Sequence, residues 1–313
     1  MVRALILLLA LTPFSAPAWN KPGHMAIGAI AHDVLKQDDP AAIARVTALL
    51  KQHPSYAESW APKLTDLPDD QRDRALFMFA AKWADDIRGN KEFDRPTWHY
   101  INIPYKPAGE PDSLQPPPAP PINIVSQTKA NLDIAAGKGP ADQQTPAARA
   151  VAAGWVFHLV GDVHQPLHAV SLFTRDFRPP TGDRGGTFFY VRATADARPV
   201  SLHKIWDDLL TGTETVRDAG NVATALRLDK DLAKDKLTEL AESDPEKWAS
   251  AESFNLAKEK VYAFEGKMVA GAKTGADDTP VLPDGYLKEA KRVAERRAVL
   301  AGYRLAALLK SIP

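Results

Sequence analysis

One segment, AARAVAAGWVFHLVGDVHQPLH at residues 147–168, constrains the fold of this chain more than any other. It follows a Thr-Pro pair, which suits the cap and first position of a helix, and Pro166 should end that helix. Trp155, His158 and Asp162 are three and four residues apart, so one helical stripe leads from apolar side chains to two ionisable ones. Burying a carboxylate is costly unless it is paired or binds a cation. The segment therefore predicts a core helix that carries polar chemistry.

Other histidine and aspartate residues occur in similar settings. His168 follows the proline break, and His203 and Asp207 stand four apart in SLHKIWDD, a spacing that predicts a second helical pair. Asp85 belongs to KWADDIR and His99 to TWHYIN, so each lies close to a tryptophan. Neutral imidazole and carboxylate are ligands that Zn²⁺ accepts, and catalytic zinc keeps one position open for water. The set indicates more than one metal ion.

Composition narrows the chemistry further. The 313 residues include 39 Lys and Arg, 39 Asp and Glu, eight His and no Cys. A chain of this length can bury a large core, which argues against disorder. The balanced charge excludes a basic surface over the whole protein of the kind that binds nucleic acid electrostatically. The absence of cysteine excludes disulfides, thiol nucleophiles and iron–sulfur clusters, so metal ligands must be His, carboxylate or backbone groups.

The N-terminal segment has the pattern of an export signal. Residues 1–18 (MVRALILLLALTPFSAPA) contain one basic residue, an apolar run too short to span a bilayer and a small-residue end. We expect cleavage after Ala18, which makes residues 19–313 a soluble mature chain in the periplasm or outside the cell. Trp19 then carries a free α-amine, which with its carbonyl and His24 could chelate a metal. Position alone favours a simpler interpretation, in which Trp19 only anchors the segment by packing.

The rest of the chain predicts one mainly helical domain. Apolar residues suggest helices in residues 27–50, in residues 72–87 and from Leu287 to Leu308. We expect two further helices, one after Asn221 and one after Asp244-Pro245. The Pro-rich stretch from Ile103 to Ile122 should form a long extended loop, and residues 182–200 should form one short hairpin. No internal repeat or change of composition divides the chain. We therefore expect a single all-α domain with one short β-hairpin.

Each of these features also has a purely structural explanation. A lone inward histidine is more often a hydrogen-bonded core residue. A His and an Asp four apart can form an exposed helix pair worth only about 0.2–0.5 kcal/mol. Asp85 and Arg88 can form an ordinary ion pair between residues i and i+3. Two His-x-x-x-Asp pairs, a Trp-x-x-x-x-His sequence and the WAD and HYIN motifs in one chain without cysteine nevertheless favour a metal site.

Taken in order, the motifs WNKPGH, WADDIR, WHYIN, HLVGDVHQPLH, DRGG and LHKIWD make the chain similar to the zinc-dependent nucleases of the S1/P1 family. The resemblance covers nearly all of residues 19–313 and implies a helical fold of the phospholipase C/P1 nuclease type with three zinc ions. It implies these ligands: Asp85, His99, His158 and Asp162 for the first ion; His168, His203 and Asp207 for the second; and the Trp19 amine and carbonyl, His24 and a second oxygen of Asp162 for the third. His164 would pack against or support the ligands.

The resemblance also implies metal-assisted hydrolysis of phosphodiesters. A zinc pair would lower the pKa of a bound water to give a hydroxide nucleophile, and the third ion would stabilise the departing 3′ oxygen. Asp85 would also orient the attacking water, and Arg88 would contact the phosphate as charge grows in the transition state. The products would carry 5′-phosphates, and 3′-nucleotides would also be substrates.

The substrates that the resemblance implies are single-stranded DNA and RNA, because an unpaired base can lie on an aromatic face. Tyr100 occupies the position where the family stacks a base, although a core aromatic residue would also fit. The family often has Phe and then Asp two positions later, where this chain has Tyr100 and Asn102, so base preference is open. Thr187 stands where the family commonly has Asn. The lack of cysteine and of glycosylation sequons suggests a bacterial member, which we expect to be a monomer.

Two other functions are alternatives. A zinc-dependent phospholipase C would share the fold and the three-zinc site. The short spacing from Trp19 to His24, Asp207 in place of a glutamate and the WAD-x-x-Arg element argue against it. A non-catalytic exported zinc-binding protein would need neither Arg88 nor an aromatic residue beside a ligand. The sequence therefore favours a zinc-dependent hydrolase.

Overall fold

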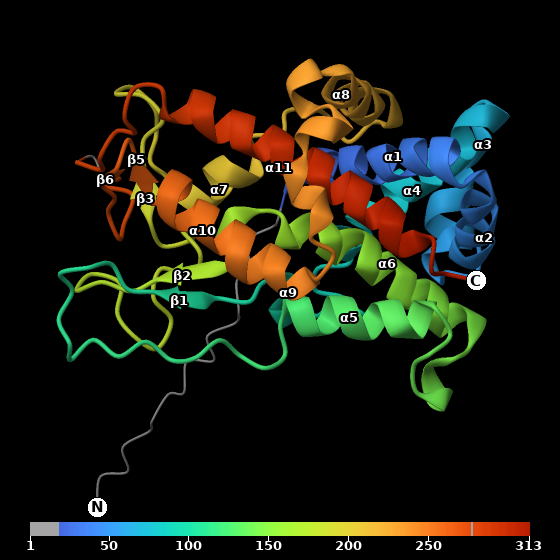
Figure 1. Ribbon diagram of the computed structural model, residues 1–313, viewed down its shortest axis with the longest axis horizontal. Coiled ribbons are helices and arrows are strands. Elements are labelled where there is room, and N and C mark those ends of the chain that lie inside the picture. The colour runs from blue at the N-terminus through green and yellow to red at the C-terminus, as the bar shows by residue number, and fades with distance from the viewer. Residues whose placement is uncertain (1–18, 277) are drawn as a thin grey trace, which may run out of the picture.

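The computed structural model describes residues 19–276 and 278–313, and it shows a mainly helical protein with a few short strands (Figure 1). The signal peptide expected at residues 1–18 lies outside the described residues. The expected core helix is α6 (Pro146–Val163), in which the Thr145 side chain accepts a hydrogen bond from the Ala148 amide over 3.2 Å. All of its residues from 152 to 163 are buried. The helical fold class is therefore confirmed.

The longer helices pack around α6 and on one another (Figure 1). They are α1 (Lys21–Asp38), α4 (Asp69–Asp86), α5 (Ile124–Ala135), α8 (Val216–Leu228) and α11 (Tyr286–Leu309). Helix α1 lies against α4, α8 and α11, whereas α5 packs on α6. Glycines permit the closest approaches, because a Cβ at Gly28 would lie 2.6 Å from the Phe77 oxygen and one at Gly302 would lie 2.3 Å from Ile30 Cγ2.

Shorter helical segments complete the described chain. The α-helical ones are α2 (Pro40–Leu50), α3 (Ala61–Thr65), α7 (Leu202–Asp207), α9 (Pro245–Lys247) and α10 (Phe254–Leu256). Three have π-helical hydrogen bonding: η1 (Tyr56–Trp60), η8 (Trp248–Ser253) and η9 (Ala257–Val261). The 3₁₀ turns are η2 (Pro96–His99), η3 (Ala141–Gln143), η4 (Pro166–His168), η5 (Lys230–Leu232), η6 (Lys234–Lys236) and η7 (Thr238–Ala241).

The strands of the described residues lie at one end of the molecule, on the left in Figure 1. They pair as parallel β1 (Ile103–Tyr105) with β2 (Val170–Leu172), antiparallel β3 (Tyr190–Val191) with β4 (Val200–Ser201), and antiparallel β5 (Ala263–Phe264) with β6 (Lys267–Met268). The expected hairpin corresponds to β3 and β4, and the other two sheets were not predicted. Strands of two or three residues are too short to show an alternating pattern.

Two helix boundaries differ from the expectation. The region 27–50 is divided between α1 and α2 at Asp39, whose side chain accepts a hydrogen bond from the Ala42 amide and so starts a new helix before Pro40. Helix α8 begins at Val216 and already contains Asn221, because the Thr215 side chain caps it by accepting from the Asp218 amide. Local capping groups therefore set both boundaries.

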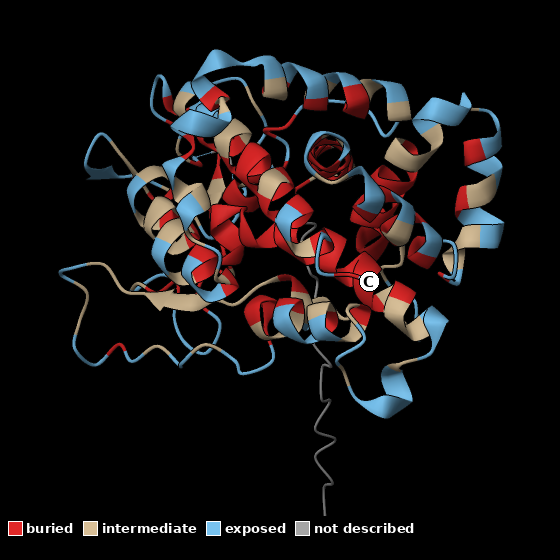
Figure 2. Cartoon of the chain, turned by 45° about the vertical axis from the view of Figure 1, so that its right-hand side comes forward, coloured by how far each residue is buried: buried red, intermediate tan, exposed pale blue. Residues whose placement is uncertain are grey.

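The buried residues form one continuous core along the helices (Figure 2). The first described residue, Trp19, belongs to this core and is fully buried. Polar residues are buried with it, and all eight histidines of the chain are among them. Among the described residues, no helix has both the length and the apolar character needed to cross a membrane.

Candidate metal centre

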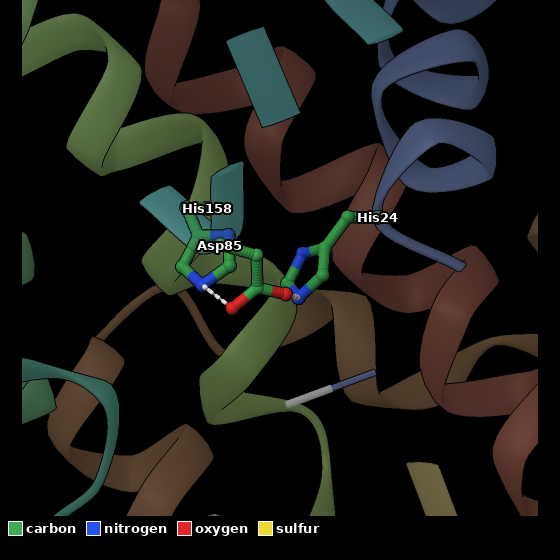
Figure 3. Close-up of side chains that lie close together, drawn as sticks. All are labelled: His24, Asp85 and His158. Carbon is green, nitrogen blue, oxygen red and sulfur yellow. Dashed lines mark ion pairs between the residues drawn. The ribbon is translucent and has the colours of Figure 1, made fainter. Parts of the chain in front are cut away.

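Three helices bring the first group of polar side chains together. His24 from α1, Asp85 from α4 and His158 from α6 converge in the core, and all three are at most 6% exposed (Figure 3). The Asp85 carboxylate lies between the two imidazoles, with His158 Nε2 3.9 Å from Oδ1 and His24 Nε2 4.0 Å from Oδ2. These distances are too long for hydrogen bonds and leave space for an ion between the rings and the carboxylate.

Asp162 is the centre of the second group. Its Oδ2 lies 2.9 Å from His99 Nδ1 and 3.1 Å from His158 Nε2, and its Oδ1 lies 3.1 Å from His24 Nε2. Both oxygens of this fully buried carboxylate therefore face imidazole nitrogens. The position one residue earlier, Gly161, leaves room for this arrangement, because a Cβ there would lie 2.8 Å from His24 Nδ1.

His168, His203 and Asp207 form the third group, and the family resemblance implied the same three residues as ligands of one ion. His168 ends the turn η4, and the other two residues lie one turn apart in α7. His203 Nε2 is 3.4 Å from Asp207 Oδ2, and Gln165 Nε2 donates a hydrogen bond to Asp207 Oδ1 over 2.7 Å. Gln165 thus fixes one carboxylate oxygen and turns the other toward the histidines.

Three of the imidazoles are oriented by backbone carbonyls. The Nδ1 atom of His158 lies 2.9 Å from the Ala81 oxygen, that of His168 2.5 Å from the His99 oxygen, and that of His203 2.6 Å from the Gly185 oxygen. A carbonyl oxygen only accepts, so Nδ1 must carry the proton and Nε2 keeps its lone pair. Histidines that bind metals are commonly held in this way.

The buried negative charge of the site favours the binding of cations. Three buried carboxylates, Asp85, Asp162 and Asp207, share the region, and the Arg88 guanidinium hydrogen bonds to the first of them. Burial alone would raise the pKa of Asp162, but the adjacent His158 and other histidines hold it well below its ordinary value. At Asp207 burial dominates and raises the pKa well above its ordinary value. Buried carboxylates of this kind are stabilised when a cation lies beside them.

Several buried nitrogen and oxygen atoms of these side chains make no hydrogen bond with any described residue. They are His24 Nδ1 and Nε2, Asp85 Oδ2, His99 Nε2, Asp162 Oδ1, His168 Nε2 and Asp207 Oδ2. Buried polar atoms are rarely left unsatisfied, and each costs about 1–3 kcal/mol when it is. All are nitrogen or oxygen atoms of the kind that zinc binds. The residues present therefore fit the bound metal ions that the sequence predicted.

Trp19 is anchored beside this centre. Its indole Nε1 donates to the Gly161 oxygen over 3.0 Å, immediately before Asp162 in α6. The Asn20 amide donates to the Asp207 backbone oxygen over 3.1 Å. These contacts hold the start of the described chain against Asp207 and against Gly161, the neighbour of Asp162. Neither contact uses the backbone nitrogen of Trp19.

A cavity of about 490 Å³ opens beside the third group, and both His168 and His203 line it. Tyr100 and Asn102 also line it, as the sequence analysis expected of substrate-binding residues. The Arg88 guanidinium lies with the first group, where its Nε and Nη2 donate to Asp85 Oδ1 over 2.9 and 2.7 Å. The structure thus brings all the predicted site residues to one region.

Sequence reasoning did not identify two residues of this region. Gln165 lies within the HQPLH motif, but its contact with Asp207 joins residues 42 positions apart. Arg184 lies within DRGG and lines the cavity. The only sequence signal for either was its place inside a motif that already contained other functional residues. His164, by contrast, is buried and contacts Arg304, in line with the supporting role expected of it.

Comparison with known proteins gives consistent results. The family model described as S1/P1 nuclease matches residues 19–313. Endonuclease 2 of Arabidopsis thaliana is 28% identical over 310 residues, which cover 96% of this chain and 93% of the relative. Endonuclease 4 of the same plant is 30% identical over 157 residues, so this match covers 50% of this chain and 48% of the relative. Against Endonuclease 4, therefore, the chain spans about half of the relative's length.

Proposed function

The chain belongs to the S1/P1 nuclease family, and from this membership we propose that it is an exported, zinc-dependent nuclease that cleaves single-stranded DNA and RNA. Hydrolysis of the phosphodiester leaves 5′-phosphates, and 3′-nucleotides are also substrates. The observation that carries the proposal is the convergence of buried imidazoles and carboxylates beside a cavity of nucleotide size. The similarity to Endonuclease 2 along most of both chains supports it.

Three zinc ions would be held by the ligand sets that the family resemblance implies, which divide the residues of the first two groups differently. Asp85, His99, His158 and Asp162 would bind the first, and His168, His203 and Asp207, which form the third group, would bind the second. Trp19, His24 and Asp162 would bind the third. The short distance from His24 to Asp162 supports the last assignment, although His24 also lies near Asp85. When bound, the ions supply Lewis-acid activation of water and stabilise charge on the phosphate.

Asp85 and Arg88 act on the reacting groups. Asp85 Oδ1 holds the guanidinium through two hydrogen bonds, whereas Oδ2 receives none from the described residues. Oδ2 is therefore the atom that accepts a hydrogen bond from the attacking water and orients it. Arg88 donates to phosphate oxygens, for which its planar fork is well matched. This pairing stabilises the negative charge that grows in the transition state.

The cavity supports the proposed preference for single strands. Its volume of about 490 Å³ suits one nucleotide, and Tyr100 offers an aromatic face on which an unpaired base can stack. Asn102 lies two residues further along the same wall and can donate to or accept from the base edge. A paired base would first have to leave its duplex, which costs stacking and pairing energy.

Export is part of the proposal because it creates the N-terminus. Removal of residues 1–18 converts the Trp19 nitrogen from an amide into an amine, which can bind a metal. The anchoring of the Trp19 indole and the Asn20 amide supports this, since both contacts form without the amine. We propose that the mature protein is a periplasmic or secreted monomer.

The experiment uses the zinc-loaded mature chain, residues 19–313. We expect it to cleave single-stranded DNA and RNA oligonucleotides much faster than duplexes of the same sequence, with 5′-phosphate ends identified by mass spectrometry. Arg88→Ala should lower kcat/KM at least about 100-fold, as the loss of a transition-state contact does. The matched control is Arg217→Ala on the exposed side of α8, which should leave the rate unchanged.

Two outcomes would contradict the proposal. Cleavage of phosphatidylcholine vesicles without cleavage of nucleic acid would indicate a phospholipase. No cleavage of either substrate by protein that binds zinc stoichiometrically would indicate a non-catalytic zinc-binding protein.

A further inference from the structure

The GDRGG segment at residues 182–186 has an unusual backbone. Gly182, Arg184, Gly185 and Gly186 all have positive φ, at 60°, 53°, 58° and 79°. Glycine adopts this region easily, but an arginine does so at a cost of about 1–3 kcal/mol. Strained residues of this kind cluster at functional sites. Asn102, with φ of 56°, is another, and it lines the same cavity as Arg184.

Hydrogen bonds of Asp183 and close packing of the glycines hold the segment in place. Buried Asp183 accepts hydrogen bonds from the Leu172 and Gly186 amides, over 2.8 and 2.9 Å, and from the Tyr262 hydroxyl over 2.5 Å. The flanking glycines pack so closely that a Cβ at Gly182 would lie 2.5 Å from the Leu172 oxygen. The backbone around Arg184 is therefore fixed, and its side chain starts from a defined position.

The Arg184 guanidinium packs on an aromatic ring but has no polar partner in the described part of the chain. It lies over the exposed Phe188 ring, 5.0 Å from the centroid, and makes no hydrogen bond or ion pair with any described residue. It lines the same cavity as the Tyr100 ring. Five N–H donors are thus offered to a ligand.

The walls of the cavity indicate which part of a nucleotide Arg184 meets. Leu167, Phe173 and several prolines line it, and no Asp or Glu is among its described lining residues. Apolar walls and the Tyr100 ring suit a base, whereas a phosphate of a flanking nucleotide would remain in solvent. Arginine recognises a base chiefly through the O6 and N7 acceptors of guanine, which match its fork.

We infer that Arg184 reads the edge of the base in this cavity and gives the enzyme a preference for guanine. The inference rests on the proposed function, because it takes the cavity to be the nucleotide site. Phe188 is a positioning residue, since it holds the guanidinium plane without reaching the base. The left-handed backbone at Arg184 places this side chain on the cavity wall.

The test measures binding of uncleavable nucleosides to the zinc-loaded mature protein by calorimetry. Guanosine should bind at least about fivefold more tightly than adenosine, as expected for one bidentate contact. Arg184→Ala should remove this difference, and so should Arg184→Lys, which keeps the charge but loses the fork. If the alanine variant does not fold, Arg184→Gly replaces it, because glycine readily adopts the left-handed backbone conformation. Arg217→Ala should bind as the unaltered protein does.

Other measurements separate the outcomes. The ratio of kcat/KM for 3′-GMP over 3′-AMP should fall in the same variants. Equal affinity of the unaltered protein for guanosine and adenosine would overturn the inference. So would a loss of inorganic phosphate binding in Arg184→Ala without loss of the guanosine preference, which would assign Arg184 to phosphate. Guanosine preference in a protein that cleaves no nucleic acid would instead contradict only the proposed function.

Discussion

At the scale of single residues, Gly161 shows how closely the metal centre is packed. It precedes Asp162 in α6, and its carbonyl accepts from the Trp19 indole. A Cβ at this position would lie 2.8 Å from His24 Nδ1 and 3.0 Å from His24 Cε1. Glycine weakens a helix interior by about 1 kcal/mol relative to alanine. Its presence here therefore serves the approach of His24 and not the stability of the helix.

We predict that Gly161→Ala displaces the His24 ring and weakens the zinc ion that it binds. The affinity for that ion should fall about 10–100-fold, which is typical when the support of a ligand is disturbed. Zinc titration with a chromophoric competitor measures this directly. The control is Gly154→Ala in the same helix, where the added Cβ would lie 3.1 Å from Trp83 Cε3. This variant should keep the full zinc content. Equal zinc affinity in both variants would show that His24 is not a ligand.

His53 determines part of the pH dependence of stability. It is buried, stacks on Trp60 and accepts a hydrogen bond at Nδ1 from the Ser55 amide over 3.0 Å. Burial lowers its pKa to about 3. The folded protein therefore keeps His53 neutral, whereas the unfolded chain takes up a proton below about pH 6.5. Protonation favours the unfolded state, so this stabilisation is complete above pH 6.5 and is lost as the pH falls toward 3.

We predict that His53→Asn removes this part of the acid sensitivity. Asparagine can accept from the Ser55 amide in the same position and does not titrate. Between pH 7 and pH 5 the unaltered protein should lose about 2 kcal/mol more unfolding free energy than the variant. Urea unfolding at the two pH values, with zinc present, provides the comparison. Parallel losses in both proteins would mean that His53 is protonated in the folded state.

At the scale of elements, the end of α6 is fixed by α11 and η8. Arg297 of α11 donates through Nε to the His164 oxygen over 3.1 Å, and Ser253 of η8 donates to the Val163 oxygen. Glu252 accepts from Arg304 over 2.6 and 2.8 Å and also from Arg297. These contacts surround the turn between Asp162 and His168. The helix end that carries predicted zinc ligands is therefore set by residues far away in the sequence.

Glu252→Gln tests this connection. The substitution leaves two buried guanidinium groups without their carboxylate, and breaking a buried ion pair in this way costs about 3–5 kcal/mol. We predict a loss near the lower value, because glutamine still accepts hydrogen bonds. Chemical denaturation measures the change, and Glu259→Gln at an exposed site of the same segment is the control. A loss no greater than that of the control would show that the charge pair contributes nothing net.

At the scale of the whole molecule, the sequence predicted the features that depend on local pattern. The Thr145 cap and apolar spacing of α6 are local, and so are the motifs that carry His158, His203 and Asp207. The sequence could not predict contacts that depend on tertiary packing, such as the hydrogen bond from Gln165 to Asp207. The left-handed backbone of Arg184 also escaped prediction, because it is imposed by Asp183 and the packed glycines. Strand β2 pairs with β1 across 67 residues, for which three-residue strands give no signal.

We expect the zinc ions to contribute to the stability of the whole fold. The proposed ligands lie in α1, α4, η2, α6, η4 and α7, so the ions join most of the central elements. Removing them leaves three buried carboxylates near one guanidinium and restores the cost of burying those charges. We predict that exhaustive chelation lowers Tm by on the order of 10 °C or more, since structural zinc contributes directly to folding free energy. Differential scanning calorimetry should show full recovery when zinc is returned. An unchanged Tm after verified metal removal would mean that the core holds these charges without ions, and it would contradict the predicted contribution of zinc to folding independently of any activity.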